Sequence, residues 1–265
     1  MQIKPHISVY GITHFYRRVR PPLFVLTNVC FDVNRGEFIS IIGPSGGGKT
    51  TLLSIIGGLQ TPTKGLVKID DICPKEAQRR RLLGFVFQDP SLLPWRTVLG
   101  NMSLANEIGV SASGKDPRDV LGIVELEQFA EYYPHELSGG MRQKVALARA
   151  FAVDPEVLLM DEPLGSLDEI TRSGMRYELL RLWNLSRKTV VMVTHSIPEA
   201  VILSDRVLIM SARPGQVVSE LEIKLPRPRS EDIERSPEFL DYTYCIREAL
   251  SRATLLDSEN GAANE

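Results

Sequence analysis

Hydrophobic and polar positions alternate in two segments near the start of the chain, residues 7–13 and 26–33. Such alternation is typical of antiparallel strands with one face buried. Mostly apolar runs come later, and each has the length of a strand covered on both faces. These runs occupy residues 37–42, 83–87, 157–160 and 189–194. Three more strands are expected at 66–69, 205–210 and 217–223, so the pattern predicts an α/β fold with a parallel sheet.

Helical patterning fills much of the remaining chain. Residues 91–136 are helical in pattern but interrupted by breakers such as 111–114 and Asp116-Pro117, which predicts a small helical insertion. A breaker-free helix is expected after Ser138, and another follows residue 168 to about 187. Residues 225–229 predict an extended linker. Ser236 and Pro237 then open a helix to about residue 256, and a disordered end is expected at 260–265.

A glycine-rich motif separates the strand at 37–42 from a helix that begins near residue 50. Its sequence, GPSGGGKT at 43–50, fills every fixed position of a phosphate-binding loop. The glycines allow backbone N–H groups to face phosphate oxygens, and the helix N-terminus adds a positive dipole end. Lys49 is expected to reach the β- and γ-phosphates, and the Thr50 hydroxyl to ligate Mg²⁺. The predicted nucleotide contacts are Gly43, Pro44, Ser45, Gly46, Gly47, Gly48, Lys49, Thr50 and Thr51.

Charge and cysteine content limit the classes of partner and the compartment that we expect for this protein. The 265 residues carry a net charge of −2, so no basic excess indicates nucleic acid or an acidic membrane surface as a partner. Cys30, Cys73 and Cys245 are far apart and lack metal-ligand spacing, which is typical of reduced thiols in a cytosolic protein. No signal peptide is evident, and no apolar run approaches the roughly 18 residues that span a bilayer.

Polar residues end three of the apolar runs. Asp161 and Glu162 end one of them, where Asp161 is expected to hold Mg²⁺ through water and Glu162 to act as general base on a water. Gln88 ends another and could touch Mg²⁺ or the attacking water. His195 ends the third and could contact a γ-phosphate. The plainer interpretations are that Asp161 and Glu162 are solvated acids at a strand end, and that His195 is a core histidine or an N-cap.

Two further sites carry a functional and a structural interpretation. Ser138, Gly139 and Gly140 open a helix with exposed N–H groups and a hydroxyl, which favours a second anion site over a plain N-cap. Tyr16 lies in a basic, aromatic stretch and could stack on an adenine ring, or could be an ordinary strand-end tyrosine.

The order of these motifs resembles that of the ATP-binding subunit of ABC transporters over residues 7–225. Residues 137–141, LSGGM, are similar to the family signature, with Met141 in place of the usual glutamine. The resemblance implies a P-loop NTPase (RecA-like) core with an antiparallel β subdomain and a helical insertion at about 90–150. Residues 1–225 would form the ATP-binding domain, and 226–265 a linker, a helix and a tail.

The resemblance also implies a mechanism that uses ATP and Mg²⁺. Two such domains pack head to tail, and the partner's Ser138, Gly139 and Gly140 cover the ATP on the phosphate loop. Glu162 polarises the attacking water, while Gln88 and His195 sense the γ-phosphate. Asp168, in the SLD sequence at 166–168, would communicate across the dimer.

A narrower likeness concerns residues 90–98 (PSLLPWRTV), the MRQ sequence at 141–143, and the tail at 225–229 and 236–240. These segments resemble importers of the nitrate, sulfonate and taurine group, despite departures at Asp70-Asp71, Leu164 and Ser196. The implied partners are transmembrane permease subunits, a second ATP-binding subunit, identical or related, and indirectly a solute-binding protein. The protein would lie peripherally on the cytoplasmic face of the inner membrane.

Two other classes remain open. A soluble ABC ATPase of DNA repair or the ribosome usually has a long coiled-coil insertion or two ATPase domains. Here about fifty residues separate Gln88 from the signature, and there is one phosphate loop. A regulatory module without hydrolysis is disfavoured because Glu162 and His195 are both present. Leu92, Leu93 and Trp95 either line a groove for a permease helix or pad the helical insertion.

Overall fold

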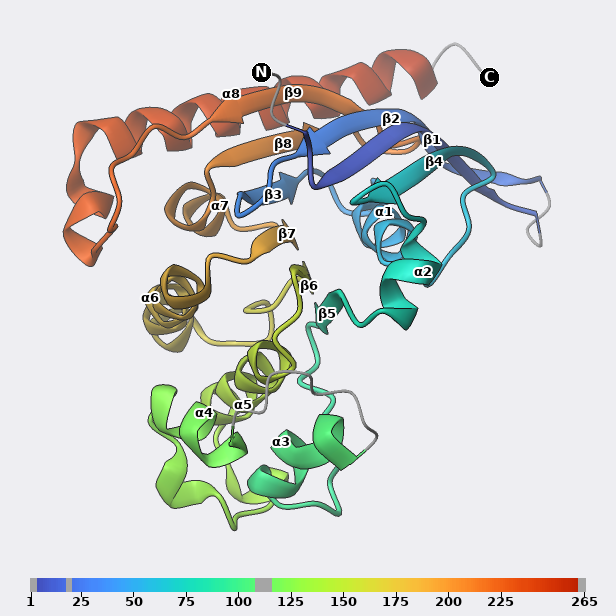
Figure 1. The fold of residues 1–265 in the computed structure, drawn as a ribbon. Helices are drawn as coiled ribbons and strands as arrows, with labels where there is room; N and C mark the ends of the chain where they lie inside the picture. The colour runs from blue at the N-terminus through green and yellow to red at the C-terminus, as the bar shows by residue number, and fades with distance from the viewer. Residues whose placement is uncertain (1–3, 18–20, 108–115, 262–265) are drawn as a thin grey trace. The chain divides into compact units, whose positions relative to one another are not determined.

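The computed structural model describes residues 4–17, 21–107 and 116–261, and it divides into two compact units. The first unit contains the chain up to Arg80 together with the chain from Thr189 onward, and the second is Arg81–Lys188. Figure 1 labels the elements of both units. This division does not coincide with residue 225, so the family-domain boundary there stays a prediction.

An antiparallel sheet in the first unit has the order β2-β1-β4. Its strands are β1 (Ile7–Tyr16), β2 (Leu23–Val33) and β4 (Lys64–Ile69). Ile7, Val9 and Ile12 of β1 are buried. The predicted strands and their buried apolar positions are confirmed, although Ser8 is buried as well and each strand begins earlier or ends later than the sequence indicated.

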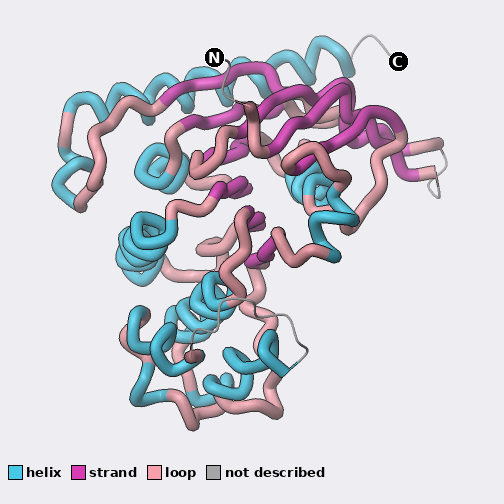
Figure 2. The backbone as a smooth tube through the Cα atoms, viewed as in Figure 1, coloured by secondary structure: helices cyan, strands magenta, loops and turns pink. Residues whose placement is uncertain are grey.

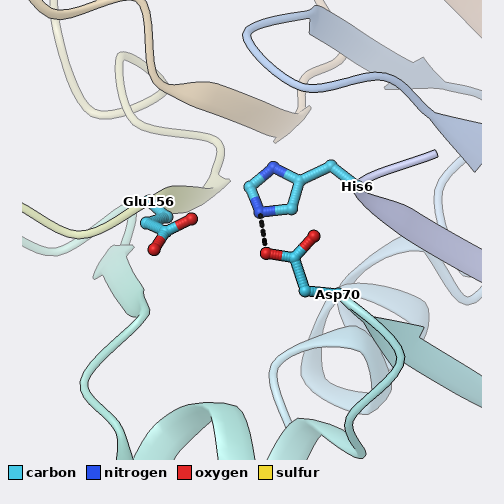
Figure 3. A group of neighbouring side chains, drawn as sticks. All are labelled: His6, Asp70 and Glu156. Atoms are coloured by element: carbon cyan, nitrogen blue, oxygen red, sulfur yellow. Dashed lines mark ion pairs between the residues drawn. The ribbon is translucent and has the colours of Figure 1, made fainter. Parts of the chain in front are cut away.

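A tight turn at the end of β4 accounts for one departure from the family pattern. Asp70 and Asp71 both have positive φ, 47° and 67°, between Ile69 and Ile72, which exchange backbone hydrogen bonds of 2.9 and 3.0 Å. Aspartate tolerates this left-handed region better than most residues. Asp70 also lies 3.6 Å from Nε2 of the buried His6, and Figure 3 shows this pair.

Parallel strands of the first unit carry the phosphate loop. The central strand β3 (Phe38–Ile42) pairs in parallel with β7 (Thr189–Val193) and with β8 (Arg206–Met210). β9 (Val217–Glu222) then pairs antiparallel with β8. All residues of β3 and β7 are buried, as expected for strands covered on both faces.

Four α-helices belong to the described part of the first unit: α1 (Lys49–Ile56), α2 (Pro74–Arg79), α7 (Ile197–Leu203) and α8 (Pro237–Gly261). A short 3₁₀ helix, Glu231–Arg235, precedes α8. α7 packs against β3 and α8, and α8 runs along β8 and β9 (Figure 1). The sequence interpretation missed α2 and α7, which are six and seven residues long.

The C-terminal segment differs from the expected extended linker. Leu225 and Arg229 are buried, so residues 225–229 pack into the first unit instead of separating two parts. α8 begins as predicted, since the Ser236 hydroxyl accepts a hydrogen bond from the Phe239 amide at 3.2 Å, but it extends to Gly261. Residues 262–265 of the expected disordered end lie outside the described residues.

The second unit is mainly helical, as predicted. Its two parallel strands are β5 (Leu83–Val86) and β6 (Val157–Asp161). α5 (Gly139–Ala152) packs against α3 (Val98–Glu107), α4 (Pro117–Ile123) and α6 (Glu169–Ser186), which appear as cyan tubes in Figure 2. Two 3₁₀ turns, Glu127–Phe129 and Pro134–Glu136, lie between α4 and α5. The predicted breakers at 111–114 lie outside the described residues.

None of the helices in the described ranges is long and apolar enough to cross a membrane. Cys30, Cys73 and Cys245 are free and exposed.

Candidate functional site

The phosphate loop connects the end of β3 to the start of α1. Gly48 is the N-cap of α1 with φ 81°, and a Cβ there would lie 2.8 Å from Leu26 Cδ2. Both the positive φ and the crowding require glycine at this position. Ser45, Gly46 and Thr50 are exposed, so the loop presents an open surface at a helix N-terminus.

Lys49 lies beneath this loop. Its side chain is buried, and Nζ donates hydrogen bonds to the Gly43 carbonyl at 2.9 Å and the Pro44 carbonyl at 2.8 Å. These bonds hold the ammonium group against the loop, where a bound phosphate would accept further hydrogen bonds from it. The glycine cradle, the buried cation and the exposed Thr50 hydroxyl together fit a nucleoside triphosphate with Mg²⁺.

Tyr16 lies beside the first turn of α1. Its hydroxyl is 3.2 Å from Thr51 Oγ1 and donates to Gln60 Oε1 at 3.3 Å. The tyrosine is half-buried. An adenine platform next to the phosphate loop remains a prediction, and the observed position agrees with it.

His195 leaves the sheet at the same edge as the phosphate loop. β3 and β7 are parallel neighbours with Ile41 opposite Val193, and the Thr194 amide donates to the Ile41 carbonyl at 3.2 Å. Gly43 and His195 therefore follow their strands at corresponding levels. The His195 side chain is exposed there. In the first unit, therefore, Tyr16 lies beside the helix that follows the phosphate loop, and His195 lies at the sheet edge where that loop begins.

Gln88 and Glu162 follow the two parallel strands of the second unit. Val86 lies opposite Met160, so both chains leave at one edge. A Cβ built on Gly165 would be 3.2 Å from both Gln88 Nε2 and Glu162 Oε2, so the two side chains lie close to this glycine. Glu162 has φ 45°, an uncommon conformation that is enriched at functional sites. Asp161 ends β6 immediately before it.

The signature residues begin α5. The Ser138 hydroxyl accepts a hydrogen bond from the Met141 amide at 3.3 Å, so the N-cap role is present. A Cβ on Gly140 would lie 2.7 Å from Thr171 Cγ2, which gives this glycine a packing role between α5 and α6. Ser138 and Gly139 are exposed and remain accessible to an anion.

Asp168 is the N-cap of α6, a role that sequence reasoning missed. Its Oδ1 accepts a hydrogen bond from the Thr171 amide at 3.0 Å. That hydrogen bond lowers the pKa of the carboxyl group below its ordinary value. The pattern D-x-x-T before a helical segment could have indicated the cap.

Two polar side chains of α5, the half-buried Arg149 and the buried Gln143, support the predicted residues. Arg149 donates to the carbonyls of Pro90 at 3.0 Å and Ser91 at 3.1 Å, which fixes the loop after Gln88. Burial lowers the pKa of this guanidinium group. Gln143 is fully buried and donates to the Pro163 carbonyl, next to Glu162. No motif could have indicated these contacts, because each joins residues far apart in sequence.

A hollow of about 550 Å³ lies within the second unit. Its lining includes Gln88, Leu92, Gly139, Arg142 and Ser166, which come from the loop after β5, the start of α5 and the loop before α6. The second unit thus collects Gln88, Asp161, Glu162, the signature and Asp168. The phosphate loop belongs to the first unit, so joint action of the two sets on one nucleotide remains a prediction.

Comparison with known proteins agrees with these features. Residues 26–165 match the ABC transporter family. The chain is 40% identical over 232 residues to the aliphatic sulfonates import ATP-binding protein SsuB of Bacillus cereus, covering 88% of this chain and 92% of SsuB. It is 39% identical over 253 residues to the nitrate import ATP-binding protein NrtD of Synechocystis, covering 90% and 92%. The ATP-binding cassette MJ0796, solved as a dimer in a post-hydrolysis state with ADP and Pi, superposes with a TM-score of 0.71 at 36% identity, covering 83% of this chain and all of that one.

Proposed function

The chain belongs to the ABC transporter family of ATP-binding subunits, and from this premise we propose that it is the energy-coupling ATPase of an importer for a small oxyanion. The observation that carries the proposal is that every functional position expected from the family is filled in this chain. The chain is also about as similar to a sulfonate importer subunit as to a nitrate importer subunit. The retained positions are Lys49, Gln88, Ser138, Asp161, Glu162, Asp168 and His195. Nitrate, alkanesulfonates and taurine are the proposed solutes.

Lys49 binds the triphosphate in this proposal. Its hydrogen bonds to two loop carbonyls are exchanged for bonds to the β- and γ-phosphates. Tyr16 stacks on the adenine. Thr50, Gln88 and Asp161 would hold Mg²⁺, which would neutralise negative charge on the phosphates.

Glu162 accepts a proton from the attacking water, and Gln88 orients that water. The positions of both side chains around Gly165 support this pairing. His195 contacts the γ-phosphate from the edge of β7. Catalysis is therefore mostly positioning and charge stabilisation, as in other phosphoryl transfers.

A head-to-tail dimer completes each site in the proposed mechanism. The partner's Ser138, Gly139 and Gly140 cover the γ-phosphate, and Asp168 transmits the state of one site to the other. The dimeric assembly of MJ0796 supports this arrangement. The partner is an identical or related subunit.

The proposed setting is the cytoplasmic face of the inner membrane, where the subunit binds a permease peripherally. A solute-binding protein acts through that permease and does not contact this chain. The names of SsuB and NrtD as import proteins support the direction of transport.

A mixing experiment tests the dimer. Ser138→Arg places a bulky cation against the partner's nucleotide, and Lys49→Ala disables the phosphate loop. In a head-to-tail heterodimer one site carries both defects and the other carries neither, so mixing should restore part of the ATPase activity. Ser138→Thr, which keeps the N-cap hydroxyl, is the control. No recovery in confirmed heterodimers would mean that each chain works alone.

Uptake measurements test the solute. Cells that lack this gene should lose uptake of labelled nitrate, an alkanesulfonate or taurine. The intact gene should restore uptake, and the Glu162→Gln gene should not. Normal uptake of all three solutes in the deletion strain would contradict the oxyanion assignment.

A further inference from the structure

Two arginines near the C-terminus hold the end of α7. Arg229 is 5% exposed, and its Nη1 donates to the carbonyls of Val201 at 3.0 Å, Ile202 at 2.8 Å and Ser204 at 2.7 Å. Its Nη2 also donates at 3.3 Å to the carbonyls of Ile223 and Leu225. A cation that satisfies the last carbonyls of a helix also complements the negative end of its dipole.

Arg227 bonds two further residues of the corner that 201–205 form at the end of α7. Its Nη2 donates to the Leu203 carbonyl at 2.8 Å, and its Nε donates to Asp205 Oδ1 at 2.9 Å. The segment from Leu203 to Asp205 is thus bonded by both arginines. A planar guanidinium group holds several acceptors in one fixed geometry, which an ammonium group cannot reproduce.

This corner is bonded in turn to the strand that carries the phosphate loop. The buried Ser204 hydroxyl donates to Ser40 Oγ at 2.5 Å. Asp205 Oδ2 accepts a hydrogen bond from the Phe38 amide at 2.9 Å, and the Asp205 amide donates to the Phe38 carbonyl at 2.7 Å. The C-terminal end of α7 is therefore fixed relative to β3.

The other end of α7 is bonded to the residues on both sides of His195. The buried Thr194 hydroxyl donates to Glu199 Oε2 at 2.5 Å, and the Ser196 amide donates to Thr194 Oγ1 at 3.0 Å. The Ser196 hydroxyl caps α7 by accepting from the Glu199 amide at 3.4 Å. Seven helical residues, about 10 Å at 1.5 Å per residue, thus separate the His195 loop from the arginines.

We propose that Arg229, assisted by Arg227, is a positioning residue that sets the place of His195 relative to the phosphate loop through α7. The inference rests on the proposed function of His195 as a γ-phosphate contact. The arginines fix the C-terminal end of α7 relative to β3, which carries the phosphate loop. The helix α7 then fixes the residues on both sides of His195. Loosening α7 displaces His195, while the phosphate loop keeps its own bonds.

The test compares hydrolysis by four forms of the full-length chain: the wild type, Arg229→Lys, His195→Ala and the double variant. Arg229→Lys should lower kcat roughly tenfold or more, because small displacements in an active site carry penalties of this size. It should change the Kd of a fluorescent ATP analogue less than about twofold, since Lys49 is unaffected. Arg247→Lys, on an exposed face of α8, is the matched control and should leave both values unchanged.

The double variant separates positioning from general destabilisation. If Arg229 acts through His195, adding Arg229→Lys to His195→Ala should produce no further loss of kcat. Multiplied losses in the double variant would overturn the proposal. If Arg229→Lys does not fold, Arg227→Lys replaces it in the same cycle.

Histidine side-chain NMR gives a readout that does not depend on hydrolysis. The chain has four histidines, so the His195 signal can be assigned by its loss in His195→Ala. Arg229→Lys should shift or broaden that signal and leave His135, in the second unit, unchanged. An unchanged His195 signal would refute the positioning role. If instead the wild type did not hydrolyse ATP but its His195 signal moved in Arg229→Lys, the proposed function would fail and the link would stand.

Discussion

The ammonium group of Lys49 donates a hydrogen bond to the Gly43 carbonyl across 2.9 Å, which ties the end of the phosphate loop to its beginning. Nζ also donates to the Pro44 carbonyl across 2.8 Å. A bound triphosphate would offer charged acceptors to this ammonium group, and hydrogen bonds to charged acceptors are roughly twice as strong as those to neutral ones. The affinity for ATP should therefore depend strongly on this side chain.

Lys49→Ala should weaken ATP binding about 10- to 100-fold and abolish hydrolysis, since hydrogen bonds to charged groups contribute about 1.5–3 kcal/mol each. Equilibrium titration with a fluorescent ATP analogue measures the affinity. Lys64→Ala, at an exposed position of β4, is the control and should bind normally. Unchanged affinity in Lys49→Ala would count against the phosphate-loop assignment.

Glu162→Gln should retain ATP binding and lose turnover by about 10²-fold or more, the usual contribution of a general base. Glutamine matches the shape of glutamate, so the packing near Gly165 is preserved. The variant should accumulate as an ATP-bound dimer, which light scattering detects. Glu169→Gln, exposed at the start of α6, is the control, and hydrolysis at the wild-type rate by Glu162→Gln would show that another group is the base.

Local signals in the sequence predicted most of the elements. The phosphate loop, the buried strands and the caps at Ser138 and Ser236 depend on residues within a few positions of one another. The short helices α2 and α7 were missed because six or seven residues give too few turns for a helical period to stand out.

Contacts between distant segments could not be predicted. Arg149 donates hydrogen bonds to Pro90 and Ser91, which lie almost sixty residues earlier in the sequence. Arg229 donates to the end of α7, about 25 residues earlier. Residues 225–229 read as an extended linker because prolines alternate with arginines, and nothing local indicates that one guanidinium group is buried. The positive φ of Glu162 is likewise set by tertiary structure.

Asp168 should affect helix stability separately from any role in the dimer. Asp168→Ala removes the cap of α6 and should lower the unfolding midpoint, while Asp168→Ser keeps an acceptor for the Thr171 amide and should not. Thermal unfolding measures this difference. If Asp168 also transmits signals across the dimer, ATPase cooperativity should fall in both variants; normal cooperativity in Asp168→Ser would leave the cap as its whole role.

The same hydrogen bond predicts a pH dependence. The pKa of Asp168 is lower in the folded chain than in the unfolded chain. Between these two pKa values the unfolded chain therefore binds more protons than the folded chain. The stabilisation by this group is complete above the unfolded pKa and is lost as the pH falls through the folded value. Asp168→Ser should remove this part of the acid dependence, and an identical acid profile would contradict the assignment.

Trp95 lies in the loop after Gln88, and its side chain is 71% exposed. The fully buried Asn101 holds this loop, because its Oδ1 accepts from the Leu93 amide at 2.7 Å and its Nδ2 donates to the carbonyls of Leu93 at 3.1 Å and Arg96 at 3.2 Å. A large aromatic side chain held in solvent does not pad the helical insertion. It suits a binding surface, where tryptophan is a frequent anchor.

Trp95→Ala combined with Leu93→Ala should therefore leave ATP binding intact, weaken co-purification with the permease and uncouple hydrolysis from transport. An amphipathic permease helix would lose its apolar contact, whereas the phosphate loop would not change. Pull-down of the permease and transport in vesicles measure the effect. The control is Tyr244→Ala with Leu240→Ala, an exposed aromatic and leucine pair on α8, which should assemble and transport normally. Normal assembly and transport in the Trp95 and Leu93 double variant would place the permease contact elsewhere on the chain.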